Sequence, residues 1–129
     1  MGLTLDQATE LEHVGDTLYI GFNDDIDKVS FPKLKTVGGA LIIEANATLK
    51  EIHLPALERV TKYLHIHDNS SLVLVDLPRL KELGAELSLA KCPVLKQVRV
   101  AKASAPARVK RLEISECALP VYVAVHIRL

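Results

Sequence analysis

The sequence predicts a mainly β protein, a solenoid of about five coils of 23 residues, each contributing a strand to a parallel stack. Two observations predict this fold. Three consecutive segments align without gaps at a period of 23 residues: FPKLKTVGGALIIEANATLKEIH from 31, LPALERVTKYLHIHDNSSLVLVD from 54 and LPRLKELGAELSLAKCPVLKQVR from 77. Apolar residues alternate with others in the middle of each segment, which is typical of a short strand with one buried face.

The repeat also predicts the order of elements within a single domain, 1–129. Residues 1–13 form an N-terminal cap, in which the spacing from Thr4 to Gln7 fits a capping box and indicates a short helix. Residues 14–118 form the coils, of which the first is degenerate and the last is displaced by two residues at Leu112. Residues 119–129 alternate as VYVAVHIRL after Pro120, which predicts a strand that leaves the solenoid and pairs elsewhere on this molecule or on another.

One column of the repeat holds Asn, or Cys as a small and mostly apolar replacement, just after each strand. Its members are Asn23, Asn46, Asn69, Cys92 and Cys117. We expect the asparagines to be buried and to form a ladder that satisfies backbone groups in their own and neighbouring coils. The N-x-S/T sequences at two of these asparagines are therefore interpreted as scaffold. The two cysteines should be stacked neighbours, compatible in spacing with a disulfide but interpreted as reduced thiols.

The repeats resemble the leucine-rich repeats, and they are most similar to the receptor L domain, a solenoid of growth-factor receptor ectodomains and some fungal and bacterial surface proteins. The segments that carry the resemblance are HVGDTLYIGFN, TVGGALIIEAN, LPALERV and LPRLKEL, and it covers about residues 11 to 117. The spacing N-x-x-L and the lack of an amphipathic helical stretch differ from a standard leucine-rich repeat. The missing helical stretch favours the L-domain form, a right-handed single-stranded β-helix.

Bulk properties limit the range of functions. The chain has 129 residues, zero formal net charge and no apolar run long enough for a membrane span. No signal peptide is visible and there are two cysteines, so we expect a cytoplasmic location by default, or export if the chain is an excised domain. Few aromatic residues and no reading helix argue against nucleic acid as a partner.

If the Leu and Ile columns point inward, the residues between them form rows across the outer face of the strands. His65 and His67 then lie side by side near Glu44, a geometry that a metal ion could use, but the open sheet offers no further ligand and we expect none. No catalytic motif is present, so we expect neither an enzyme nor a cofactor. The candidate binding face consists of Tyr19, Ile42, Glu44, Tyr63, His65, His67 and Glu86.

The leading hypothesis is a non-enzymatic module that binds a protein or glycan partner through this face. The alternative follows from charge. Residues 1–27 hold seven acids and no Lys or Arg, whereas residues 87–112 hold seven bases and no acid. Because sequence order is spatial order along a solenoid, these segments become opposite poles, and acidic-to-basic contact would join copies head to tail as a homo-oligomer.

Overall fold

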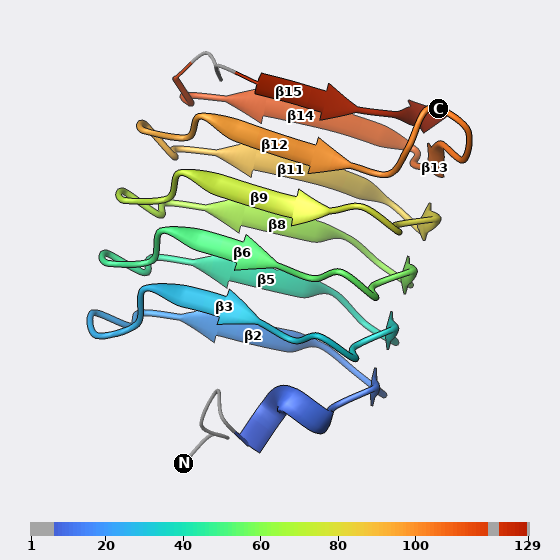
Figure 1. Cartoon of the computed structure of the whole chain (residues 1–129), viewed down its shortest axis with the longest axis horizontal. Helices are drawn as coiled ribbons and strands as arrows, with labels where there is room; N and C mark the ends of the chain where they lie inside the picture. The colour runs from blue at the N-terminus through green and yellow to red at the C-terminus, as the bar shows by residue number, and fades with distance from the viewer. Residues whose placement is uncertain (1–6, 119–121, 129) are drawn as a thin grey trace.

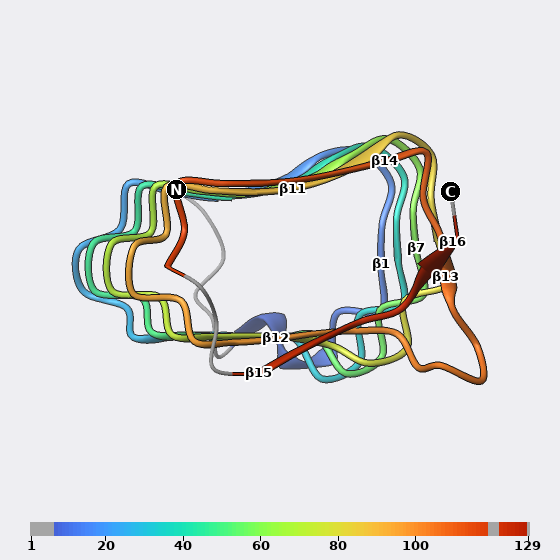
Figure 2. The same cartoon turned by 90° about the horizontal axis from the view of Figure 1, so that it is seen from above.

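Each repeat contributes one strand to each of three parallel sheets, so the chain climbs as a β-solenoid (Figure 1). The computed structural model describes residues 7–118 and 122–128. Viewed along the stacking direction, two long sides face each other and a short side joins them at one end (Figure 2). The predicted fold class is confirmed.

The three sheets are named here A, B and C. Sheet B, one long side, contains β2 (Leu18–Gly21), β5 (Leu41–Glu44), β8 (Leu64–His67), β11 (Glu86–Ala90) and β14 (Arg111–Ser115). Sheet C, the other long side, contains β3 (Lys28–Ser30), β6 (Glu51–His53), β9 (Leu74–Leu77), β12 (Gln97–Val100) and β15 (Tyr122–Val125). Sheet A, the short side, contains β1 (His13–Val14), β4 (Thr36–Val37), β7 (Arg59–Val60), β10 (Glu82–Leu83), β13 (Ala107–Arg108) and β16 (Ile127–Arg128).

The strand register follows the repeat columns read from the sequence. In sheet B, Leu18 pairs with Leu41, Leu41 with Leu64, and Leu64 with Leu87, each at the repeat period. The last step pairs Leu87 with Leu112, two residues further along than the period, as predicted. In the same coil the 101–106 loop projects beyond the short side of the solenoid (Figure 2).

Inward-pointing Leu, Ile and Val side chains fill the space between the two long sides. Leu41, Ile43, Leu49 and Ile52 of one coil are all completely buried, and their equivalents in the next two coils are nearly so. Burial of each such side chain contributes roughly 1.5–3 kcal/mol of transfer free energy. A single core therefore runs the length of the solenoid and holds the outer faces rigid.

The predicted asparagine ladder is present. Asn46 Nδ2 donates to Asn69 Oδ1 at 3.1 Å, and Asn23 Nδ2 donates to Asn46 Oδ1 at 2.9 Å. Asn46 and Asn69 are fully buried, and Cys92 continues the column in the following coil. Cys92 and Cys117 are both free thiols, and burial raises the pKa of Cys92 to about 11.

A second column of special backbone geometry precedes the ladder and was not predicted. Its members have positive φ angles between 52° and 57° and are Phe22, Ala45, Asp68, Lys91 and Glu116. This left-handed conformation is unusual for residues with a Cβ. It turns the chain off sheet B at the same point in every coil, and it leaves the Phe22 side chain 76% exposed.

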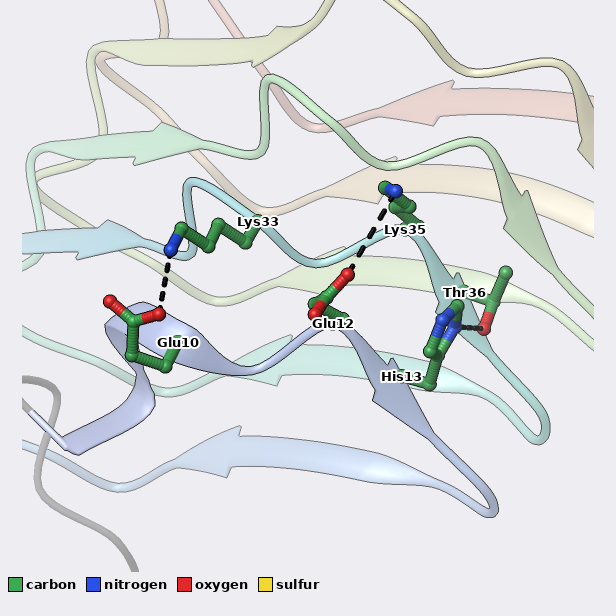
Figure 3. A network of polar contacts seen from close by, with 6 residues as sticks. All are labelled: Glu10, Glu12, His13, Lys33, Lys35 and Thr36. Atoms are coloured by element: carbon green, nitrogen blue, oxygen red, sulfur yellow. Dashed lines mark hydrogen bonds and ion pairs between the residues drawn. The ribbon is translucent and has the colours of Figure 1, made fainter.

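The predicted N-terminal capping helix is not supported in the described residues. They contain no α-helix but a short 3-10 helix, Gln7–Glu10, and Thr4 lies outside them. The carbonyl of Glu12 already accepts hydrogen bonds from the backbone of Lys35, at 2.7 Å, and of Thr36. Side-chain contacts from Glu10 to Lys33 at 2.6 Å and from Glu12 to Lys35 at 3.8 Å also join this segment to the next coil (Figure 3). In the described residues, coil-to-coil pairing thus begins at Glu12, just after the 3-10 helix ends.

The C-terminal segment stays within the solenoid instead of leaving it. Strand β15 pairs in parallel with β12, and β16 pairs with β13. The two strands thus add a further layer to sheets C and A, although Pro120, Val121 and Leu129 lie outside the described residues. Val125 and Ile127 pack against the apolar core, which helps to hold the segment in this position.

Candidate functional site

The outward rows predicted from the repeat lie on the outer face of sheet B, named here the sheet B face. Tyr19 is paired with Ile42, and Ile42 with His65, along one row. Glu44 is paired with His67 in the next row. The candidate residues from β2, β5 and β8 are therefore near neighbours on one surface.

Exposure is uneven along the sheet B face. Tyr19 is 47% exposed, and Ile42, Glu44, Tyr63, His65, His67 and Glu86 are half-buried. The outward residues of β11 differ, because Ser88 and Ala90 are almost completely buried. The accessible part of the face therefore lies on β2, β5 and β8, and again on β14, where Arg111 is exposed.

Three rings form a row along and just before β8, named here the ring row. The centroids of Tyr63 and His65 are 4.2 Å apart with the planes tilted by 40°. Those of His65 and His67 are 4.7 Å apart with the planes nearly parallel, at 15°. Because the histidine rings turn their faces toward each other, these faces are covered, and only the ring edges are left for outside contacts.

The two histidines have different polar surroundings. His67 Nε2 lies 2.8 Å from Ser88 Oγ, so this ring is held by a hydrogen bond from the neighbouring strand. His65 Nε2 lies 3.4 Å from Glu86 Oε2 but is not aligned with it, and this buried nitrogen has no hydrogen bond among the described residues. Burial, reinforced by the neighbouring His67, lowers the pKa of His65 even though Glu86 and Glu113 oppose the shift. His65 is therefore neutral at pH 7.

Tyr19 lies along β2 above Gly21. A Cβ added at Gly21 would lie 2.5 Å from the Tyr19 ring, so glycine is what allows the ring to lie flat over the strand. Desolvation, followed by the charge and hydrogen bonding of Glu44, raises the pKa of Tyr19. Tyr19 thus carries a protonated hydroxyl beside a carboxylate and keeps one ring face toward solvent.

Phe22 is a candidate that the sequence analysis missed. It follows β2 directly and is the most exposed of the large apolar side chains in the described chain. The left-handed backbone of its column is what directs it outward. The only available signal was its position immediately before the asparagine ladder, because nothing in its own residue type indicates a positive φ.

The described residues contain no group of three His, Cys, Asp or Glu side chains placed to hold a metal ion. They also contain no helix with the length and apolar character needed to cross a membrane. Comparisons with protein families, with curated proteins and with solved structures find no match to this chain.

Proposed function

We propose that this protein is a non-enzymatic recognition module of the receptor L-domain-like, leucine-rich-repeat type, which binds its partner through the sheet B face. One observation carries the proposal. Aromatic and imidazole side chains are displayed on hydrogen-bonded strands above a fully buried core, with Tyr19 and Phe22 the most exposed of them. Aromatic side chains on a rigid support contribute much binding energy because they lose little conformational entropy.

A protein partner suits this face better than a glycan. Glycan binding on an aromatic platform would use an exposed ring face, whereas the faces of His65 and His67 cover each other. The carboxylate of Glu86 lies beside the neutral imidazole of His65, and this carboxylate suits polar groups of a protein surface. Tyr19 and Phe22 would supply the apolar anchors next to this polar centre.

Affinity capture with quantitative mass spectrometry tests the proposal. Immobilised wild-type protein is compared with the double variant Tyr19→Ser and His65→Ala, and with the control variant Gln97→Ala on the opposite long side, where Gln97 is exposed. We expect one or more proteins to be captured by the wild type and the control and lost with the double variant. Capture of the same proteins by all three baits would contradict the proposal, and a parallel glycan array would identify a sugar ligand if that expectation of a protein is wrong.

A second candidate function, head-to-tail self-assembly, is favoured by the ends of the core. Ile114 occupies an inward column yet is 46% exposed, whereas the equivalent Ile43 and Ile66 are fully buried. Within the described chain, β2 and β14 each have a strand neighbour on one side only. Such ends favour addition of a further coil, here from a second copy.

Attraction between the acidic and basic ends would guide self-assembly, but the acidic end has less unpaired charge than the sequence suggests. Glu10 and Glu12 of the acidic segment already contact lysines of the next coil. Asp24, Asp25 and Asp27 remain exposed near the first coil. Sedimentation velocity at low and high salt tests the mode: we expect a mass that grows with protein concentration at low salt, and a monomer at all concentrations would rule it out.

A further inference from the structure

A basic hollow lies on the short side of the solenoid, away from the sheet B face. It has a volume of about 430 Å³, and the 101–106 loop forms one wall. The lining includes a single acid, Glu82, and four basic side chains: Arg59, Lys81, Arg108 and Arg128. The hollow therefore has a formal charge of +3, from four positive groups and one negative group.

The pairing of charges elsewhere shows that this arrangement is exceptional. In every other pair of residues that lie opposite each other on neighbouring strands and are both charged, one residue is an acid and the other is a base. These opposite pairs are Lys28 with Glu51, Arg59 with Glu82, Glu82 with Arg108, Asp76 with Arg99, and Glu86 with Arg111. Arg108 with Arg128 is the one like-charged pair among the registered residues of the described chain.

Two positive charges directly opposite each other on neighbouring strands destabilise the sheet. Glu82 lies next to Arg108 in register, but it is also 3.9 Å from Arg59, so one carboxylate is shared by two guanidinium groups. Lys81 has its own partner, because it lies 3.4 Å from Glu58. Arg108 and Arg128 are both exposed, and an anion from outside this set would neutralise the pair more fully than solvent does.

We propose that the basic hollow is a binding site for a phosphate-bearing anion with at least two negative charges. The guanidinium group has a planar fork of donors that matches phosphate oxygens, and two forks from adjacent strands can hold one diphosphate. The Ser104 hydroxyl in the loop wall adds a neutral donor, and the volume falls within the range of small-ligand sites. The ligand would relieve the repulsion between Arg108 and Arg128 when it binds.

Isothermal titration with inorganic pyrophosphate at fixed ionic strength tests the proposal. We expect wild-type protein to bind it, and Arg128→Gln or Arg108→Gln to weaken binding at least about tenfold, since each removes charge-assisted hydrogen bonds. The matched control is Arg79→Gln, which removes the same charge from an exposed turn outside the hollow. It should bind as the wild type does.

Thermal unfolding without ligand separates loss of a site from loss of the fold. Because Arg128→Gln removes a like-charge contact, it should unfold at the same temperature as the wild type or higher, while losing the stabilisation by pyrophosphate. Equal affinities for wild type and Arg128→Gln, no binding at millimolar pyrophosphate, or equal stabilisation by sodium chloride at matched ionic strength would overturn the proposal. The proposal would also be overturned if the protein does not bind pyrophosphate but forms a dimer that Arg128→Gln abolishes. The hollow would then bind an acidic segment of a second copy.

The source of the phosphate is identified by a second titration, with adenosine diphosphate. Tighter binding than pyrophosphate would support a nucleotide, with contacts from the base or ribose to the loop wall. Equal binding would support a ligand recognised by its phosphate groups alone.

Discussion

The substitution Asn69→Ala gives the sharpest test of how the coils are held together. Asn69 Oδ1 accepts hydrogen bonds from the backbone nitrogen of Asn46 at 3.2 Å and from its Nδ2 at 3.1 Å, and Asn69 Nδ2 donates to Ile43 O at 3.1 Å. Alanine would remove all three hydrogen bonds at a fully buried position, although Asn46 Nδ2 would keep a second bond, to Ile20 O at 3.2 Å. At about 1–1.5 kcal/mol for each, the loss in free energy of unfolding is about 3–4.5 kcal/mol.

Equilibrium unfolding in urea, followed by circular dichroism, measures this loss. The matched control is Asn23→Ala, at the half-buried end of the ladder, where the side chain donates one hydrogen bond to Asn46. It should cost only about 1 kcal/mol. If the two variants lose similar free energy, hydrogen bonding within the ladder does not hold the coils together and the reasoning fails.

Three further predictions concern backbone spacing, thiol chemistry and pH. Gly84→Ala should destabilise the protein by about 1–3 kcal/mol or prevent folding, because the new Cβ would collide with a backbone carbonyl of the neighbouring coil. Gly15 lies in the same column, but a Cβ there meets open space, so Gly15→Ala should change the melting temperature little. In the folded protein, Cys117 should react with iodoacetamide faster than Cys92. Cys117 is half-buried, whereas Cys92 is fully buried and its pKa is raised to about 11. Equal alkylation rates of the two thiols, measured by mass spectrometry, would contradict this prediction. Folding lowers the pKa of His65, so between the folded pKa and about 6.5 the unfolded state binds more protons than the folded state. The free energy of unfolding should therefore fall as the pH drops below about 6.5, and level off below the folded pKa. In urea titrations at pH 7 and pH 5, His65→Gln should show a smaller decrease than the wild type.

Much of the fold could be predicted from the sequence because the coils repeat. The period fixes which residues stack, so Leu64 above Leu41 and Asn69 above Asn46 follow directly from counting. Properties that do not depend on residue type in the repeat could not be predicted. The left-handed column contains Phe22, Ala45 and Lys91 among others, which share no chemical character, so its conformation is imposed by the tertiary stacking of the coils.

The two ends of the chain were predicted poorly for a related reason. The capping-box spacing indicates a local preference, but the backbone of Glu12 already pairs with the second coil, and this non-local pairing limits the turn that precedes it. At the other end, alternation predicts a strand but not its neighbour. The choice of β12 as the partner of β15 depends on the length of the preceding connection, which departs from the repeat.

The candidate surfaces show where sequence periodicity stops being informative. Counting places Tyr19, Ile42 and His65 in one row, but it treats Ser88 as equivalent to them, and only packing shows that Ser88 is buried and bonded to His67. The basic hollow is still less visible, because Arg108 and Arg128 are separated by an interval unlike that of the other coils. A like-charged pair formed at such an irregular step is not a by-product of the repeat, whose other charged pairs are all complementary, and this is why we assign it a ligand instead of a structural role.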